Sequence, residues 1–329
     1  MSIYKNALWL SDLDEVIANS SFLSLLEGTR VMVTGASGLV CSAVVDLLVR
    51  YNETHRKKIH ILAAGRSLQR MKERFTEAWD REYFTYVAYD AADPSGCPHI
   101  ACDYIIHGAG NSSPGMIMKE PVETMVSNFS GMKALLDLAR ESGTKRLLYI
   151  STSEVYGKKE TIGPFKEGDY GFIEQLDPRS SYSIGKKAAE TLCVSYASEY
   201  QVDSVIVRPG HIYGPTAAKR DDHVAAVWAY ACARGEDLVM KSSGEQLRSY
   251  CYCLDCASAI LIVLLKGETG HAYNISNPAS VVTIREMAEL LAEGAGVSVR
   301  RELPSGAEKK GFNPMMNSSL DSSALLSLG

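Results

Sequence analysis

An apolar strand, a glycine turn and a helix follow one another near the N-terminus. Residues 29–34 contain the run Arg-Val-Met-Val, the turn Gly35-Ala-Ser37-Gly38 comes next, and an apolar-periodic helix starts at Leu39. Gly35 permits a tight turn, Gly38 lets a phosphate approach the backbone, and the helix N-terminus offers unpaired N–H groups. This stretch therefore predicts an α/β fold that binds a dinucleotide through Gly35, Ser37, Gly38 and Leu39.

One position departs from that glycine pattern. Cys41 stands where the third glycine of a dinucleotide turn lets the helix pack closely on the strand. Cysteine is small enough to be accepted there. We expect the packing of helix on strand to be somewhat less close.

Strands and helices alternate along the rest of the first two thirds of the chain. Strands are predicted over residues 58–64, 83–89, 103–110, 146–151 and 204–208, and helices over 121–142 and 182–200. This order predicts a Rossmann-type, doubly wound parallel sheet. We expect three parts: an N-terminal helical extension (1–28), an NAD(P)-binding domain (29–215) and a smaller substrate-binding lobe (216–329). Residues 205–208 and 250–254 are expected to return to the main sheet.

The residue after the second strand bears on the choice of dinucleotide. An NAD site usually has Asp or Glu there to hold the ribose diol, whereas an arginine suits a 2′-phosphate. This chain has Arg66. Arg66 therefore favours NADP, and the alternative is a solvated arginine.

A tyrosine and a lysine four residues apart indicate a catalytic base. On the predicted helix, Tyr182 and Lys186 project from the same face, so an ammonium can lie beside a phenol and favour its ionised form. An ordinary phenol has a pKa of about 10, so it needs such help to act as a base at neutral pH. Alone, the pair could equally be two solvated side chains.

Composition excludes several classes of partner. The chain has 329 residues, 46% of them hydrophobic, and a formal net charge of −5, so it lacks a basic field for nucleic acid or an anionic membrane. Eight scattered cysteines, no signal peptide and no spanning apolar run predict a reduced, cytoplasmic protein. The run Cys251-x-Cys253-x-x-Cys256 is expected to pass from a strand into a helix, and no metal site is predicted.

Taken together, the motifs resemble the extended short-chain dehydrogenase/reductases that act on nucleotide sugars. The resemblance covers about residues 29–295. Its motifs are Thr34-Gly35-x-x-Gly38, His107-x-Ala109, Thr152-Ser153-Glu154-Val155-Tyr156-Gly157, Tyr182-x-x-x-Lys186 and Arg208-Pro209-x-x-x-Tyr213-Gly214-Pro215. Within this family, the stretch from Thr152 to Gly157 is most similar to UDP-glucuronate decarboxylases.

The resemblance implies a role for each motif. Tyr182 would take the proton of the sugar 4-hydroxyl while hydride leaves C4, Lys186 would hold the ribose and lower the pKa of the tyrosine, and Thr152 would bind the same hydroxyl. Contacts to an NAD cofactor are implied for Asp90, His107, Ala109 and Pro209, and contacts to a nucleotide-sugar substrate for Ser153, Glu154 and Arg248. The resemblance also implies a homodimer formed through helices around 126–138 and 188–200. The alternative is that these helix faces belong to the core.

Ser153 and Glu154 bear on the later step of the reaction. By resemblance, 4,6-dehydratases have Asp after the catalytic Thr, and a serine is too weak an acid to expel a hydroxyl. Epimerases usually have a small uncharged pair, which Glu154 does not match. Decarboxylation needs neither a strong acid nor a small uncharged pair, because a carboxylate β to a C4 ketone can leave as carbon dioxide. A 4-epimerase, 4,6-dehydratase or 4-reductase and a non-catalytic NAD(P) sensor remain alternatives, and Arg66 fits poorly with the NAD of the decarboxylases.

Overall fold

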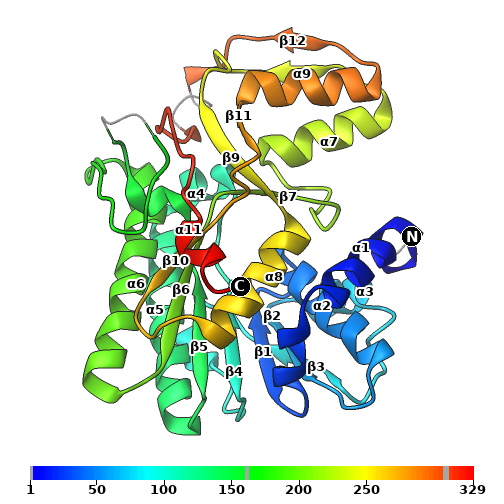
Figure 1. Cartoon of the computed structure of the whole chain (residues 1–329). Helices are drawn as coiled ribbons and strands as arrows, with labels where there is room; N and C mark the ends of the chain where they lie inside the picture. The colour runs from blue at the N-terminus through cyan, green and yellow to red at the C-terminus, as the bar shows by residue number, and fades with distance from the viewer. Residues whose placement is uncertain (1–2, 160–162, 307–310) are drawn as a thin grey trace.

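A seven-stranded parallel sheet forms the centre of the computed structural model, which describes residues 3–159, 163–306 and 311–329 (Figure 1). The strand order is β10-β6-β5-β4-β1-β2-β3, and every pairing in it is parallel. The strands are β1 (Arg30–Thr34), β2 (His60–Gly65), β3 (Phe84–Ala88), β4 (Tyr104–His107), β5 (Arg146–Ile150), β6 (Ser204–Pro209) and β10 (Ala272–Ile275). The predicted Rossmann-type fold is confirmed.

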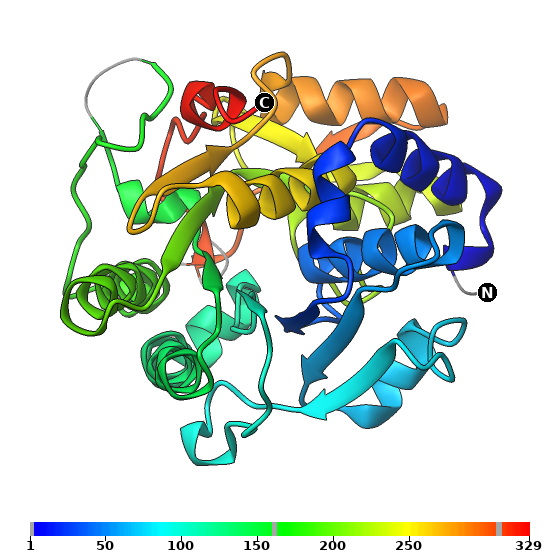
Figure 2. The same cartoon turned by 60° about the horizontal axis from the view of Figure 1, so that its bottom comes forward.

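Helices cover both faces of this sheet (Figures 1 and 2). On one face lie α2 (Leu39–Thr54) and α8 (Cys253–Lys266), and on the other α5 (Pro121–Ser142) and α6 (Ser181–Tyr200). Alternate residues of a strand point to opposite faces, so Val31 and Val33 of β1 join the core beneath α2, and Met32 joins the core beneath α5. Burial on both faces explains why these strands are continuously apolar. Shorter helices flank the layers: α3 (Leu68–Arg74), α4 (Pro114–Lys119) and α11 (Ser323–Leu326).

A smaller lobe sits beyond one end of the main sheet (Figure 1). It contains a three-stranded sheet of β7 (His211–Tyr213), β9 (Leu247–Tyr252) and β11 (Val281–Thr283), and a pair formed by β8 (Leu238–Met240) and β12 (Val299–Arg301). Helices α7 (Val224–Arg234) and α9 (Ile284–Ala295) pack there around the buried Trp228 and Leu238. Thr283 and Glu286 form a capping box that fixes where α9 begins.

The prediction that residues 250–254 return to the main sheet is wrong. Strand β9 ends at Tyr252 and pairs with β7 and β11 of the small sheet, and α8 begins at Cys253. Helix α8 then packs against α2, and the strand that joins the main sheet is β10, beside β6. Both segments are short and apolar, so periodicity alone did not distinguish them. The cysteine run does pass from a strand into a helix, as expected, and its three thiols are free.

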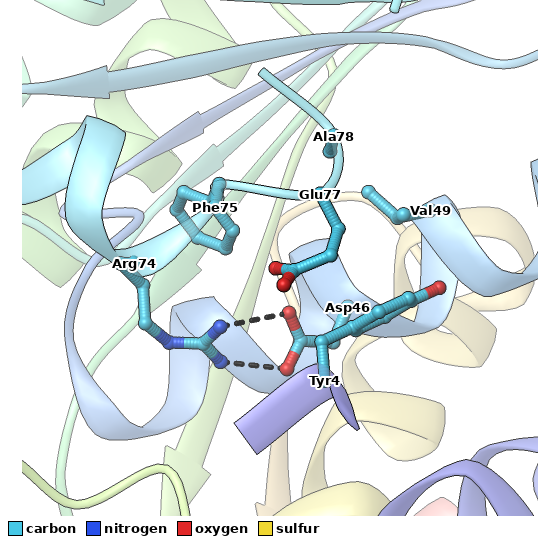
Figure 3. A pocket seen from close by; sticks show the side chains of 7 residues that line it. All are labelled: Tyr4, Asp46, Val49, Arg74, Phe75, Glu77 and Ala78. Carbon is cyan, nitrogen blue, oxygen red and sulfur yellow. Dashed lines mark hydrogen bonds and ion pairs between the residues drawn. The ribbon is translucent and has the colours of Figure 1, made fainter. Parts of the chain in front are cut away.

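The N-terminal extension is anchored by a buried carboxylate. Helix α1 (Ala7–Ala18) presents Trp9, whose indole Nε1 donates to Asp46 Oδ2 of α2 at 3.0 Å. Arg74 at the end of α3 donates to both oxygens of Asp46, at 3.1 and 2.6 Å (Figure 3). The adjoining cavity of about 10 Å³ is no larger than a single water requires. The cluster is therefore a structural junction between α1, α2 and α3.

No helix in the described ranges is both long enough and apolar enough to cross a lipid bilayer.

Removal of the Arg74 charge should destabilise the protein, because Asp46 would then be a buried carboxylate without a cation. We expect Arg74→Met to lower the free energy of unfolding by about 3 kcal/mol, measured by urea denaturation. Arg234→Met is the matched control, since Arg234 pairs with Glu236 in an ion pair whose side chains are both more than half exposed, and its effect should be much smaller. Equal effects of the two substitutions would contradict this account.

Candidate active site

The sequence-predicted site residues come together at one edge of the main sheet. All its strands are parallel, so their carboxyl ends share that edge, where ligands of open α/β sheets bind. Each of the first six strands ends at or just before one of these residues, in chain order Gly35, Arg66, Asp90, His107, Thr152 and Pro209. The small sheet of the second lobe, with Arg248 on β9, follows β6 through the loop after Pro209.

The glycine turn after β1 is shaped for a phosphate. Gly35 has a φ of +68°, and a Cβ there would lie 2.9 Å from the backbone nitrogen of Ala109. Gly38 is exposed and is the N-cap of α2, without a side chain that caps the helix. Ser37 and Leu39 flank it and are partly exposed. The first-turn N–H groups of α2 and its positive dipole end are therefore available to a pyrophosphate, and this turn fits a dinucleotide.

Cys41 fits its position because the residue next to its sulfur, Gly108, has no side chain. A Cβ on Gly108, which follows β4, would lie 2.3 Å from the Cys41 sulfur. The sulfur thus occupies the space that a side chain at position 108 would need. The glycine that is absent from the turn after β1 is compensated by Gly108, directly after the neighbouring strand β4.

His107 is a neutral, buried residue at the same edge. Its Nδ1 is 2.7 Å from Thr34 Oγ1, which also accepts from the N–H of Ala109 at 3.3 Å. Burial, followed by the charge of Lys186, lowers the pKa of His107 to about 3. The Nε2 atom is buried without a hydrogen-bond partner among the described residues. These bonds hold the loop over which a cofactor is expected to lie.

Thr152, Tyr182 and Lys186 meet beside the end of β5. The Thr152 side chain acts on the Tyr182 phenol and lowers its pKa, and its Oγ1 accepts from the N–H of Glu154 at 3.3 Å. Lys186 lies one turn further along α6, with its Nζ 6.0 Å from the centre of the Tyr182 ring and 4.7 Å from that of Tyr149. The Lys186 ammonium donates to the carbonyl of Ile150 at 2.7 Å. The structure therefore brings the three residues together beside the end of β5, with Tyr182 and Lys186 buried and Thr152 partly exposed.

The pKa values of this pair differ from the expected ones. Burial, followed by the charge of Glu154, raises the pKa of Tyr182 to about 12, although Thr152 and Arg179 act in the opposite direction. Burial lowers the pKa of Lys186 to about 8, against the charges of Cys41 and Glu190. The expectation that Lys186 lowers the pKa of Tyr182 is not met in this structure, because the ammonium is directed at the Ile150 carbonyl. Desolvation outweighs the attraction of opposite charges.

Glu154 is paired with Arg179, a residue that was not predicted to belong to the site. Arg179 Nη2 donates to Glu154 Oε1 at 2.9 Å, and the Arg179 side chain is buried. Arg179 comes three residues before Tyr182, so the same segment supplies the phenol and the partner of Glu154. This short distance in sequence from Tyr182 was the signal by which Arg179 could have been predicted as a site residue. Ser153 lies next to Glu154 and is buried.

Arg248 brings a buried positive charge to the site from β9. Its guanidinium donates to the carbonyls of Leu247 and Met315, at 2.8 and 2.9 Å, and within the described residues it has no carboxylate in contact. Burial lowers its pKa, while Tyr250 and Glu154 act in the opposite direction. The Tyr250 hydroxyl is buried and forms no hydrogen bond within the described ranges. Such a charge can accept an anionic part of a ligand.

A second arginine fixes the position of the turn that carries Thr152 and Glu154. Arg208 on β6 donates to both carboxylate oxygens of Glu190 on α6, at 3.0 and 2.7 Å. It also donates to the Tyr156 hydroxyl at 3.0 Å, and Tyr156 donates to Asn274 on β10 at 2.6 Å. This network joins two strands, α6 and the turn after β5. The Arg-Pro motif at the end of β6 thus supports the site.

A protein-family model matches residues 31–276, which include all these elements from β1 to β10. The model is that of the NAD dependent epimerase/dehydratase family. The chain belongs to this family. The resemblance to extended short-chain dehydrogenase/reductases, expected from the motifs, is confirmed. The chain is accordingly an enzyme of the group that includes epimerases, dehydratases and decarboxylases of nucleotide sugars.

Two relatives are similar to this chain over most of its length. UDP-glucuronic acid decarboxylase 1 of Xenopus tropicalis is 30% identical over 88% of this chain and 66% of its own length. UDP-glucuronic acid decarboxylase 6 of Arabidopsis thaliana is 31% identical over 84% of this chain and 77% of its own length. Just under two thirds of the Xenopus protein is therefore matched.

A solved structure shows the same fold at lower identity. The dTDP-glucose 4,6-dehydratase of Bacillus anthracis, solved in complex with NAD, has a TM-score of 0.75 and 20% identity, over 91% of this chain and 90% of that one. At this identity the similarity concerns the fold. It agrees with the parallel sheet and the smaller lobe described above.

The contact between Gly108 and Cys41 can be tested by adding a methyl group at position 108 and removing the sulfur at position 41. Gly108→Ala should lower the free energy of unfolding by about 1–3 kcal/mol, because the new Cβ overlaps the Cys41 sulfur. Adding Cys41→Ala removes that sulfur and should restore most of the loss, as measured by urea denaturation of both single variants and the double variant. Simple addition of the two single effects would show that the two positions do not compensate each other.

Proposed function

We propose that this chain is a UDP-glucuronate decarboxylase that oxidises C4 of the sugar transiently. The observation that carries the proposal is the grouping of Thr152, Glu154 and Tyr182 where α6 packs against the turn after β5, with Glu154 bonded to Arg179 three residues before Tyr182. The charge of Glu154 also acts on Arg248 of β9. The relatives named UDP-glucuronic acid decarboxylase, at about 30% identity, support the same reaction.

Tyr182 and Thr152 are placed to bind the sugar 4-hydroxyl together, and Tyr182 is the residue that deprotonates it. The Thr152 side chain acts on the Tyr182 phenol, and a sugar hydroxyl bound between the two would lie against both oxygens. When bound, oxidised NAD(P) would supply the hydride acceptor for C4, the hydride that is later returned, and a positive charge near the phenol. Tyr182 takes the hydroxyl proton and later gives it back. Because burial raises the pKa of Tyr182, the phenol depends on such a nearby positive charge to act as a base.

Ser153 and Glu154 favour loss of carbon dioxide over loss of a hydroxyl. Ser153 is too weak an acid to protonate a departing hydroxyl. Glu154 is held as an ion pair by Arg179 and lies within electrostatic range of Tyr182 and Arg248. The C4 ketone makes the substrate carboxylate a β-keto acid, and breaking its bond to C5 releases carbon dioxide and leaves an enolate that is reprotonated. We assign the positioning of this end of the sugar to Glu154 and Arg248.

The anionic groups of a nucleotide sugar match the charge at Arg248. A guanidinium held by backbone carbonyls keeps its full charge for a phosphate or carboxylate. The protein has a net charge of −5, so attraction of an anionic substrate depends on local arginines of this kind.

A nucleotide-sugar 4-reductase is the second candidate, and Arg66 favours it. An arginine after β2 suits NADP, and an enzyme that uses NADP exchanges its cofactor with solution for net reduction. A non-catalytic sensor is disfavoured, because a simple binder need not keep Thr152, Tyr182 and Lys186 together beside the end of β5.

Carbon dioxide release from UDP-glucuronate should depend on the Tyr182 hydroxyl. The purified enzyme, given NAD or NADP, is tested with UDP-, dTDP-, GDP- and CDP-sugars for carbon dioxide, C4 inversion and formation of a 4-keto-6-deoxy product. We expect carbon dioxide from UDP-glucuronate alone, and we expect Tyr182→Phe to lower kcat at least about 100-fold. Tyr196→Phe, on the same helix but bonded to Asp137, should keep normal turnover. C4 inversion without loss of mass would contradict decarboxylation.

We also propose a homodimer, formed through α5 and α6. Four apolar side chains at helical spacing are exposed on α5: Val122 (67%), Met125 (41%), Val126 (45%) and Phe129 (42%). Val194 of the adjacent α6 is 47% exposed, whereas Ala189 and Cys193 of that helix lie in the core. An exposed apolar stripe on two packed helices suits a second copy of the chain, as the family resemblance implies.

Phe129→Glu should convert this dimer into a monomer, because it places a charge in the centre of the apolar stripe. Sedimentation velocity of wild type and variant at several concentrations measures the change. Leu290→Glu, on the exposed face of α9, is the matched control and should remain dimeric. A wild-type protein that is monomeric at all concentrations would remove the proposal.

A further inference from the structure

The N-terminal extension contacts the place where the second lobe rejoins the main domain. The chain leaves the small sheet at Tyr252, the last residue of β9, and enters α8 at Cys253. Helix α1 of the extension lies against both α2 and α8 (Figures 1 and 2). The extension precedes the residues that the family model matches, so membership of the family assigns no role to it.

Two side chains of α1 hold the end of β9. The Tyr252 hydroxyl donates to Asp12 Oδ2 at 2.7 Å, and both side chains are partly buried. The Trp9 indole stands edge-on to the Tyr252 ring, with 6.5 Å between the ring centres. Burial, followed by the hydrogen bond to Asp12, raises the pKa of Tyr252, so the phenol stays a donor at neutral pH. The last residue of β9 is therefore fixed by a polar and an aromatic contact.

The same helix is fastened to α2, the helix that begins at the glycine turn. Trp9 donates to the buried Asp46 of α2 at 3.0 Å. Arg50, one turn further along α2, donates to both oxygens of Asp14, each at 2.7 Å. Leu13 lies on the same face of α1 as Trp9 and is fully buried in the core that α2 and α8 share. Helix α1 thus bridges α2 and the end of β9.

The strand that the extension holds is also the strand that carries Arg248. Residues 248 and 252 are four apart on β9, so their side chains project from the same face of the small sheet. Strand β9 is the middle strand of that sheet, between β11 and β7, so the three strands move together. A shift at Tyr252 therefore moves Arg248 relative to Tyr182, which belongs to α6 on the other face of the main sheet from α2.

We propose that the extension is a brace that sets the position of Arg248 relative to the glycine turn, and that Asp12 and Tyr252 are its positioning residues. The proposal rests on the proposed function, in which Arg248 binds an anionic part of the nucleotide sugar. With the bond between Asp12 and Tyr252 in place, β9 keeps one position against α2, and the guanidinium is preorganised for its ligand. Without the bond, substrate binding itself must order β9, whereas proton transfer at Tyr182 is unaffected.

Loss of this bond should weaken substrate binding more than it slows turnover. We expect Asp12→Ala and Tyr252→Phe each to raise KM for UDP-glucuronate about ten-fold and to leave kcat within about two-fold, because one hydrogen bond to a carboxylate is lost. The double variant should be no worse than either single variant, since both remove the same bond. Asp12→Asn keeps an acceptor for the Tyr252 hydroxyl and should restore KM to near its wild-type value. Unchanged KM in both single variants would overturn the proposal.

Asp14→Ala is the matched control, because it removes a bond between α1 and α2 while the buried bond between Trp9 and Asp46 still fastens the helix. It should leave KM unchanged. Hydrogen exchange gives a readout without turnover: the amides of β9 should exchange about ten-fold faster in Tyr252→Phe than in wild type, and at the wild-type rate in Asp14→Ala. Absence of carbon dioxide from UDP-glucuronate would refute the proposed reaction, and the exchange of β9 would then decide about the brace. Equal exchange of β9 in the two variants would refute the brace.

Discussion

The parallel alignment of the main sheet is the constraint on which the rest of this structure depends. Strands that run in one direction must be joined by helices that cross over the sheet, and they all end at one edge. Residues that are far apart in sequence, such as Gly35, Thr152 and Pro209, therefore become neighbours without any contact designed between them. The second lobe adds Arg248 from the other side of this edge. Every part of the proposed chemistry uses this single boundary.

Burial at that edge disfavours the charged forms of side chains, and the groups of the site differ in how they respond to it. Tyr182 has a raised pKa and Lys186 a lowered one, so both side chains are shifted toward their neutral forms. Glu154 is paired with Arg179, and Glu190 is paired with Arg208. The acid and base groups of the site therefore rely on charge delivered by ligands, whereas the supporting groups carry their own partners.

The two departures from the family pattern have different characters. Cys41 is a matter of packing, since the missing glycine is matched by Gly108 across the strands, and it need not change what the turn binds. Arg66 is a matter of charge, since it puts a cation at the end of β2, where an acidic residue usually selects NAD. A substitution that conserves space maintains a function, and one that changes charge at a strand end can alter which ligand is bound.

The sequence by itself determined the order of strands and helices, the glycine turn and the Tyr182–Lys186 motif, because periodicity and short-range spacing express local geometry. The predicted strands and both long helices agree with the structure to within three residues at each end. The tertiary structure decided what depends on distant contacts. It placed β10 in the main sheet and residues 250–252 in the small one, paired Glu154 with Arg179, and turned Lys186 toward the Ile150 carbonyl. Desolvation and long-range pairing depend on which surfaces meet, and no local pattern of residues records that.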